Sequence, residues 1–476
     1  MSPSRVIVTL IRHGKGDRSK PAPVRYASYW GTRAEKLSAL TDLTAGKSTL
    51  STLEASADWY APLIPTAGGA DWAACPKVTD LFPWQQPGSM ISRTWPVAPT
   101  ASLLEERWEQ FVATSVPDER LKYFAPSKTG RSITTKVPGM TKLVDLKPGD
   151  AHQPIVRFGM RSFDRQWTFE DPRLAKTESP SLWASLSSKQ VFLTTMNTTS
   201  LGGGPAATLT TAVPDKHHFR GSYGGKDVVP LYRDAKGTPN ADPAALKAIS
   251  EKLGIEVTVE QLFAYAFGVL AGTDYTERFH EALETPGPRI PLTADPDLFA
   301  QMARHGEKLI WLQTFGERFG AGTLPTSGIT WKAEPSRLPD AKSDIKYYAA
   351  TETLQVADGT LTGVPEGVWN FGVSGMNVIP KWLGYRMSKP AGRAASSPSP
   401  LDHIRPTTWS PEWSAELVEI VAAIRDTLAL VPGGIALLDE IVAGQLIGAG
   451  ELPAVPPALR KPPKVKPGSA ADAELF

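Results

Sequence analysis

The chain has 476 residues, of which 41% are hydrophobic and 21% charged, and 51 basic against 49 acidic side chains give a net charge of +2. These values describe an ordinary globular protein, and the net charge alone does not indicate a nucleic-acid partner. The single cysteine, Cys75, excludes an internal disulfide and a zinc site built from several cysteines. Because no run of eighteen apolar residues and no cleavable signal is recognisable, we expect a cytoplasmic protein without a membrane span.

The N-terminal segment predicts a small element that cannot fold by itself. Residues 5–12 and 23–30 are rich in β-branched and aromatic side chains and predict two strands that could pair, and residues 31–40 predict a short helix. The first forty residues also carry an excess of six positive charges, which suits contact with a polyanion. Two strands and a helix are too few to bury a core, so this segment predicts the edge of a domain.

The rest of the chain predicts a mixed α/β (α+β) fold with a strand-rich half, a helical centre and a C-terminal helical pair. Leucine, tryptophan and phenylalanine at helical spacing predict a helix over 101–114, and strand-like segments follow to about residue 235. Helices are expected between about 258 and 318, over 381–387, and over 413–430 and 434–447. The proline- and lysine-rich end, 451–476, predicts a disordered tail.

The most informative segment is 155–174, IVRFGMRSFDRQWTFEDPRL. Arginines interleaved with aromatic side chains are typical of surfaces that hold phosphates and stack on or read bases. The alternative is a strand pair with a salt-bridged polar face, in which Asp164 pairs with a neighbouring arginine. The arginines of this block are Arg157, Arg161, Arg165 and Arg173.

Motifs for catalysis are incomplete throughout the sequence. Arg12-His13-Gly14 follows the first predicted strand, as in histidine phosphatases, but no second histidine lies in a suitable context. The glycine clusters do not form phosphate loops, and the adjacent His217 and His218 have no further metal ligand at a suitable spacing. Neither a glycine-rich S-adenosylmethionine loop nor an Asn/Asp-Pro-Pro-aromatic loop for a flipped adenine is present. We therefore predict no catalytic residue, metal site or cofactor site in this chain.

Five blocks occur in an order that resembles a known family: RSFDRQWTFEDPRL, DVVPLYRD, the segment from LFAYAFGVLAGTDYTERF to IWLQ, LTGVPEGVWNFGVSGMNVIPKWLGYRM and SSPSPLDHIRPTTW. Over roughly residues 80–445 the chain resembles the C-terminal specificity region of type ISP restriction–modification enzymes and related defence-system adenine methyltransferases. Residues 1–45 resemble the last strands of a methyltransferase domain. The expected domains are then 1–45, a target-recognition region in two parts over 46–330 and 331–450, and the tail 451–476.

The resemblance implies a module that recognises double-stranded DNA in a sequence-specific way. It also implies a methyltransferase, and possibly a helicase or nuclease, as a further portion or partner, with S-adenosylmethionine as the cofactor of that methyltransferase. On this view DNA contact is expected from basic and amide side chains, with Arg161 and Arg165 foremost. The full predicted set is Arg157, Arg161, Arg165, Arg173, Lys216, Arg220, Arg233, Asn377, Lys381 and Arg386.

Alternatives remain for the function and for single residues. The chain could be a complete enzyme whose methyltransferase half is not recognisable, a protein-interaction subunit of a defence complex, or a histidine phosphatase built on Arg12-His13-Gly14. Arginines that mark a family can also hold its scaffold instead of reading bases. Arg289, held between two prolines, is expected to be structural.

Overall fold

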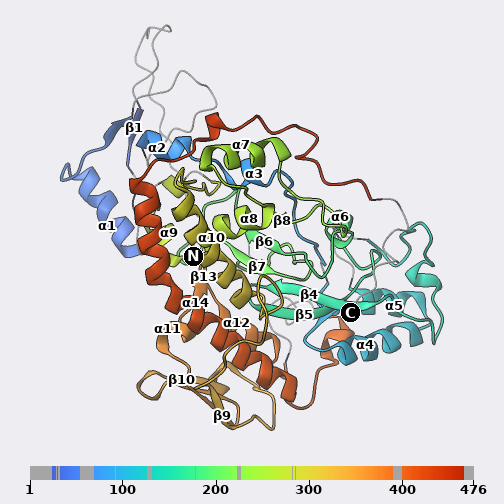
Figure 1. The fold of residues 1–476 in the computed structure, drawn as a ribbon. Coiled ribbons are helices and arrows are strands. Elements are labelled where there is room, and N and C mark those ends of the chain that lie inside the picture. The colour runs from blue at the N-terminus through green and yellow to red at the C-terminus, as the bar shows by residue number, and fades with distance from the viewer. Residues whose placement is uncertain are drawn as a thin grey trace, which may run out of the picture. The chain divides into compact units, whose positions relative to one another are not determined.

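The computed structural model of the chain divides into two units, Met1–Ala73 and Ala74–Phe476. It describes residues 24–27, 29, 33–53, 69–91, 93–125, 131–176, 178–221, 227–280, 282–284, 286–389 and 399–465, coloured along the chain in Figure 1. The strand predicted over 5–12 and the Arg12-His13-Gly14 triplet lie outside the described residues.

In the first unit, strand β1 (Val24–Tyr26) pairs with β2 (Ser51–Leu53) in an antiparallel ladder. The helix predicted over 31–40 is confirmed as α1 (Arg33–Thr44). Leu37 and Leu40 of this helix are exposed, at 54% and 37%. Helix α2 (Gly69–Ala74) leads to the boundary with the second unit.

The second unit begins with two small antiparallel sheets and the helices around them. One sheet has the order β3-β5-β4 and the other β7-β6-β8. Helix α4 is the one predicted over 101–114, and the threonine before it, Thr100, caps its first turn by accepting a bond from the Leu103 amide. The elements are α3 (Val78–Leu81), β3 (Val97–Ala98), α4 (Ala101–Ala113), α5 (Pro117–Phe124), β4 (Ile155–Arg161), β5 (Asp164–Phe169), α6 (Pro180–Trp183), β6 (Phe192–Thr195), β7 (Thr208–Thr210) and β8 (Asp227–Pro230).

The predicted helical centre consists of α7 (Pro243–Leu253), α8 (Val259–Ala271), α9 (Thr273–Arg278) and α10 (Pro296–Gln313). A capping box between Thr258 and Gln261 starts α8, and Asp295 caps α10. The backbones of α8 and α10 approach closely at a glycine: a Cβ atom on Gly306 would lie 1.8 Å from the carbonyl oxygen of Ala264. At this point α8 packs directly against α10 without an intervening side chain.

The remaining elements form a four-stranded antiparallel sheet of order β10-β11-β12-β9, a two-stranded β13-β14 ribbon, and three helices. They are β9 (Thr330–Ala333), β10 (Ile345–Tyr348), β11 (Thr353–Val356), β12 (Gly359–Thr362), α11 (Glu366–Trp369), β13 (Gly372–Val373), β14 (Met376–Asn377), α12 (Val378–Tyr385) and α14 (Pro411–Ala443). Short 3-10 helices cover Leu143–Asp145, Ala282–Glu284, Lys342–Asp344, Ala349–Thr351, Pro400–His403 and Ala449–Glu451. The mixed α/β class predicted from the sequence is thus confirmed.

The C-terminal helical pair predicted over 413–430 and 434–447 is wrong, because α14 is one 33-residue helix that contains Pro432. Pro432 and Gly433 face solvent, so the backbone bond that proline removes leaves no buried group unpaired and the helix continues. By length and composition α14 could cross a membrane, but core helices pass the same test. Trp413, Leu417 and Ile424 in its first half are buried, as in a core helix.

One of the buried clusters joins the two predicted parts of the recognition region. It contains Phe163 and Phe219 from the strand-rich part together with Leu354, Trp382 and Leu417 from beyond residue 330. A separate cluster around Trp95, Trp108 and Phe111 packs α4 on β5. The boundaries predicted at residues 45, 330 and 450 stay predictions, but one core crosses residue 330.

The beginning of the predicted disordered tail lies against the second unit. Arg233 donates to the carbonyl oxygens of Leu459 and Lys461 at 2.7 and 2.8 Å, and Ser181 donates to that of Pro463 at 2.8 Å. Side chains of the body therefore hold residues 459–463 in place, which the composition of the segment does not reveal.

Candidate nucleic-acid interface

The arginine–aromatic block forms the β4–β5 hairpin, and the tip of this hairpin is buried. Arg161 at the end of β4 lies opposite Asp164 at the start of β5 in the strand register, and Phe163 in the two-residue turn between them has a φ of 64°. The Phe163 ring makes an edge contact with Phe371, with centroids 5.7 Å apart, inside the core cluster that crosses residue 330. Hairpin tips usually lie in solvent, whereas this one anchors the strand-rich part to the rest of the unit.

Three of the predicted DNA-contacting arginines are buried and paired with carboxylates. Arg161 pairs with Asp215 at 2.7 Å, and the Arg161 side chain is 11% exposed. Arg173 forms a two-pronged pair with Asp171, with a shortest distance of 2.6 Å, and is 4% exposed. Arg386 has no exposed side-chain surface and bridges Asp164 and Glu416, each at 3.1 Å. In this conformation the three guanidinium groups hold the scaffold.

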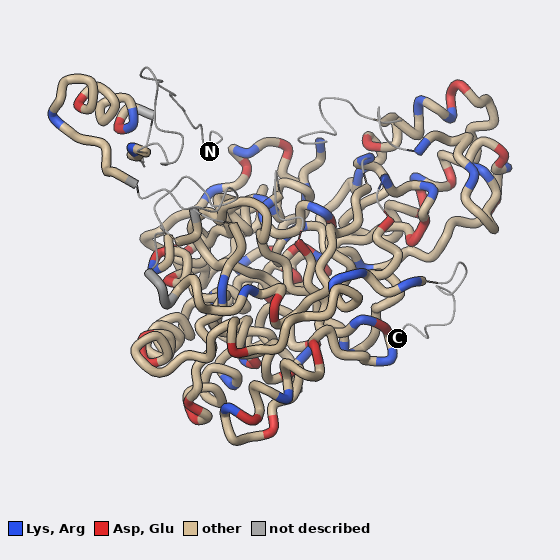
Figure 2. Tube along the Cα trace, turned by 90° about the horizontal axis from the view of Figure 1, so that it is seen from above, with Lys and Arg blue, Asp and Glu red and all other residues tan. Residues whose placement is uncertain are grey.

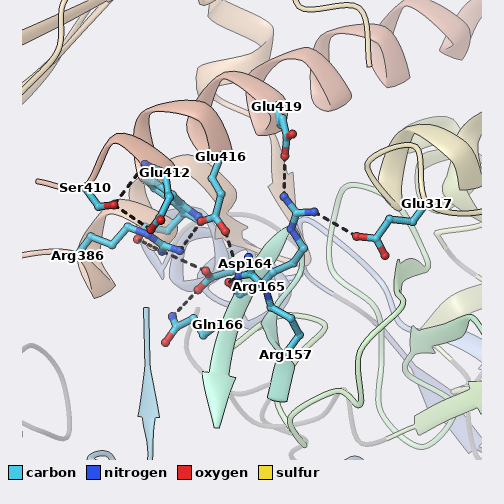
Figure 3. Close-up of polar contacts among 11 residues, drawn as sticks. Arg157, Asp164, Arg165, Gln166, Glu317, Arg386, Ser410, Glu412, Glu416 and Glu419 are labelled. Atoms are coloured by element: carbon cyan, nitrogen blue, oxygen red, sulfur yellow. Dashed lines mark hydrogen bonds and ion pairs between the residues drawn. The ribbon is translucent and has the colours of Figure 1, made fainter. Parts of the chain in front are cut away.

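Arg157 and Arg165 are more accessible but are also paired (Figure 3). Arg157 pairs with Glu416 at 3.2 Å, and its guanidinium carbon lies 4.2 Å from the Trp167 ring centroid. Arg165 lies between Glu419 of α14, at 2.7 Å, and Glu317, at 3.4 Å. The Arg157 and Arg165 side chains are 46% and 20% exposed, so a phosphate would compete with these carboxylates for either one.

The carboxylates of this network were not found by sequence reasoning. Glu416 and Glu419, in the first turns of α14, pair with Arg157 and Arg165 of the hairpin, whereas Glu412, one turn earlier, bonds to Ser410 instead (Figure 3). The only sequence signal is a row of acids on an otherwise apolar helix. Arg157 and its partner Glu416 are 259 positions apart in the sequence, and Arg165 and its partner Glu419 are 254 apart. No local pattern identifies such partners.

A second group of predicted residues gathers near the loop 214–221 and helix α12. Gly221 closes this loop against β14: a Cβ on Gly221 would lie 3.2 Å from Met376 Sδ and 3.3 Å from Arg161 Nε. Lys216 and Arg220 lie on the loop and are partly exposed, and burial lowers the pKa of Arg220. Asn377, at the start of α12, is exposed. Lys381 follows one turn later.

Lys381 differs from the arginines in having no carboxylate partner within the described part of the chain. Its ammonium lies 5.3 Å from the Tyr385 ring centroid. Burial, together with Arg161 and Lys342, lowers the pKa of Lys381. Burial raises the pKa of Tyr385 to about 12, so this phenol stays protonated near neutral pH. Arg233, by contrast, is occupied by the carbonyl groups of residues 459 and 461.

Of the two adjacent histidines, His218 is a core residue and His217 is partly exposed. His218 is 1% exposed and makes a 3.0 Å hydrogen bond with Thr194 Oγ1. Burial lowers the pKa of His218 to about 3, which keeps the ring neutral. Among the described residues no group of three or more histidine, cysteine or acidic side chains is arranged for a metal ion.

Charges of both signs are interspersed along the second unit, as Figure 2 shows. Many cations in the strand-rich part serve the fold, including two that sequence reasoning did not single out. Arg120, 1% exposed, donates to the carbonyl groups of Thr114, Leu143, Val144, Leu146 and Val112. Arg107, 2% exposed, donates to backbone carbonyls of Trp95, Val97 and Ile404. An anion can therefore bind only where a cation is accessible and is not already occupied by carboxylates or backbone carbonyl groups.

The fold is similar to those of three solved structures, two of which are type ISP restriction–modification enzymes. A cryo-EM structure of a DrdV–DNA complex matches with a TM-score of 0.57 and 17% identity, covering 87% of this chain and 42% of that one. A nuclease-deletion mutant of the type ISP enzyme LlaGI, in complex with a DNA substrate mimic, matches with a TM-score of 0.56 and 17% identity, over 88% of this chain and 33% of LlaGI. The ATP-dependent type ISP restriction–modification enzyme LlaBIII bound to DNA matches with a TM-score of 0.57 and 15% identity, covering 87% of this chain and 27% of that one.

The chain thus spans less than half the length of each of these three structures, and at such identities the likeness concerns the fold alone. No curated protein matches the sequence significantly. The sequence model of the type ISP C-terminal specificity domain matches residues 80–420, which is most of the chain and nearly the range over which the ordered blocks resemble that family. This protein therefore belongs to the type ISP C-terminal specificity domain family.

Proposed function

We propose that this chain recognises double-stranded DNA as the specificity part of a type ISP-like restriction–modification system. The observation that carries the proposal is the family match over residues 80–420. The similar structures of DrdV, LlaGI and LlaBIII are complexes with DNA or a DNA mimic, which supports the same partner here. Partly exposed arginines on the hairpin and a lysine of α12 without an ion-pair partner among the described residues supply the cationic chemistry that a phosphate backbone requires.

The finer proposal is that recognition is sequence-specific and serves an adenine methyltransferase that lies in another portion or another chain. S-adenosylmethionine would then bind to that methyltransferase. A helicase or nuclease could belong to the same system, and we propose the cytoplasm as its compartment. The absence of a recognisable S-adenosylmethionine loop and of the adenine-gripping motif in the sequence supports a recognition role for this chain.

Binding to a fluorescently labelled random-sequence duplex tests the proposal directly. We expect binding at low salt that weakens steeply between about 50 and 200 mM, because each phosphate contact releases a counterion. Failure to bind at low salt would contradict the proposal and favour a protein-interaction subunit instead.

Titration with S-adenosylmethionine, followed by calorimetry, separates the recognition module from a complete enzyme. We expect no heat of binding from this chain. Saturable binding would show that a methyltransferase site has escaped recognition, and the assignment of catalysis to another portion would then fail.

A further inference from the structure

Helix α12 divides its side chains into two faces with different chemistry. Val378, Ile379, Trp382 and Leu383 are buried in the core, and Arg386 just beyond the helix end joins them. Asn377, Lys381 and Tyr385 recur at intervals of four residues and therefore lie on one side of the helix, away from that core. An amide, an ammonium and a phenol are thus aligned along one face, on which Asn377 is exposed and Lys381 and Tyr385 are partly buried.

Lys381 is electrostatically unmatched at this position. No carboxylate lies within ion-pair distance of its ammonium among the described residues, although the side chain is partly buried. Burial and two cations, Arg161 and Lys342, lower the pKa of Lys381, whereas the charge of Asp164, which is itself paired with Arg386, raises it. The guanidinium carbon of Arg161 lies 5.8 Å from the centroid of the same Tyr385 ring. Keeping an unpaired ammonium partly desolvated beside like charges costs free energy, which a bound anion would offset.

The neighbouring groups suit the same anion. Asn377 is exposed, and its side chain makes no capping hydrogen bond, so its amide N–H groups are available to a ligand. The Tyr385 hydroxyl keeps its proton near neutral pH and can donate it in a hydrogen bond. Lys216 lies on the loop 214–221, which contacts β14 next to Asn377 through Gly221. The acids Asp164 and Asp215 nearby are buried and already paired with Arg386 and Arg161.

We propose that the outer face of α12 binds the DNA backbone, with Lys381 holding a phosphate and with Asn377 and Tyr385 donating hydrogen bonds to phosphate or sugar oxygens beside it. The assignment to the backbone follows from chemistry: an ammonium acts as a point charge, whereas base reading favours planar, two-pronged groups. This inference rests on the proposed DNA recognition and assigns the contact to a face separate from the β4–β5 arginines.

The test compares Lys381→Gln with the wild-type chain in binding to random-sequence duplexes over a salt series. Removing one phosphate contact should reduce the slope of log affinity against log salt by about 0.9 and weaken binding about eightfold at 0.1 M salt. Lys381→Arg should restore most of the affinity and most of the salt dependence. The matched control is Lys247→Gln on α7, where Lys247 is 78% exposed and pairs with Glu251, and we expect no change there.

The outcomes distinguish this inference from the proposed function. If the wild-type chain binds duplex but Lys381→Gln keeps its affinity and slope, the α12 site is wrong while DNA recognition stands. If the wild-type chain does not bind, both fail. A loss confined to duplexes of one base composition would overturn the backbone assignment in favour of base contact.

Asn377→Ala provides a second variant that does not depend on core packing. Because Asn377 is exposed and its side chain makes no capping bond, the substitution should leave the thermal midpoint unchanged. We expect weaker binding, by about three- to tenfold, for the loss of a charge-assisted hydrogen bond, with an unchanged salt slope because no charge is removed. Affinity equal to that of the wild type would remove Asn377 from the site.

Discussion

The β4–β5 hairpin and helix α12 both carry cations, but they use them differently. On the hairpin, Arg157, Arg161 and Arg165 each have a carboxylate partner on another element. Just beyond the end of α12, the buried Arg386 bridges two carboxylates, whereas Lys381 on the helix has none within ion-pair distance among the described residues. A planar guanidinium can satisfy several acceptors in a buried place, while a lysine in the same chain is left for an external anion.

The difference shows that cation content alone is a poor guide to a nucleic-acid surface. The hairpin has the composition of a DNA-contacting segment, yet its charges are largely neutralised by Glu317, Glu416 and Glu419. The α12 face has fewer cations and no such neutralisation. Four experiments can break or sharpen this contrast.

The largest effect is expected from Arg386→Met, which keeps the aliphatic packing but removes the charge between Asp164 and Glu416. Asp164 is 3% exposed, so loss of its partner leaves a buried carboxylate without its counter-charge. We expect a loss of about 3–5 kcal/mol in the free energy of unfolding, measured with urea. Lys381→Gln, on the outer face of the same helix, should cost less than about 1 kcal/mol. Equal losses from the two would erase the distinction between the faces.

The second largest effect is expected from His218, a buried imidazole, as the pH is lowered. His218 has a pKa of about 3 in the folded chain against an ordinary 6.5, so below pH 6.5 the unfolded chain takes up a proton that the folded chain does not. This group therefore lowers stability as pH falls from 6.5 towards 3, by about 2–3 kcal/mol between pH 6.5 and 4.5. His218→Gln should show a shallower pH dependence in urea unfolding by up to one proton. Parallel profiles would mean that His218 is accessible to protons in the folded chain.

A smaller effect is expected from Glu416→Gln, because Glu416 serves both Arg157 and Arg386. The glutamate is 12% exposed, and loss of its two charge-assisted bonds should cost about 1.5–3 kcal/mol in urea unfolding. Glu412→Gln, one turn earlier on α14, is the matched control and should change stability by about 0.5 kcal/mol or less. If both variants behave alike, the bridge does not stabilise the contact between hairpin and helix.

The smallest change in stability, below about 1 kcal/mol, is expected from the double variant Glu317→Gln/Glu419→Gln. Both acids are about 40% exposed, and their replacement frees Arg165. The hairpin would then resemble α12, and affinity for random-sequence duplex should rise by up to about eightfold at 0.1 M salt. Unchanged affinity would show that Arg165 does not reach DNA even when it is released.

The sequence predicts much of the helical architecture because its signals are local. The cap residues Thr258 and Asp295 and the buried face of α8 are visible within a few positions of each other. Of the arginine pairs, that of Arg173 with Asp171 spans two positions and could be anticipated. Arg157 and Arg386 share the partner Glu416, which lies 259 residues after Arg157 and 30 after Arg386. This pairing is evident only from the fold.

The single helix α14 illustrates the same limit. Pro432 and the two glycines after it are ordinary stop signals, and they predicted a break between two helices. Packing of the residues on both sides outweighs those signals. The predicted DNA-binding residues stay predictions, although the structure separates those that are accessible from those that support the fold.

The buried tip of the β4–β5 hairpin has a practical consequence for engineering new specificities. Phe163 lies in the same core as Leu354 and Trp382, so a chimera joined near residue 330 would bring together two halves of a core that had not evolved together. A transplant of the whole stretch from residue 80 to the middle of α14 would keep that core intact. Exchange between relatives should therefore succeed with the entire block and fail with either part alone.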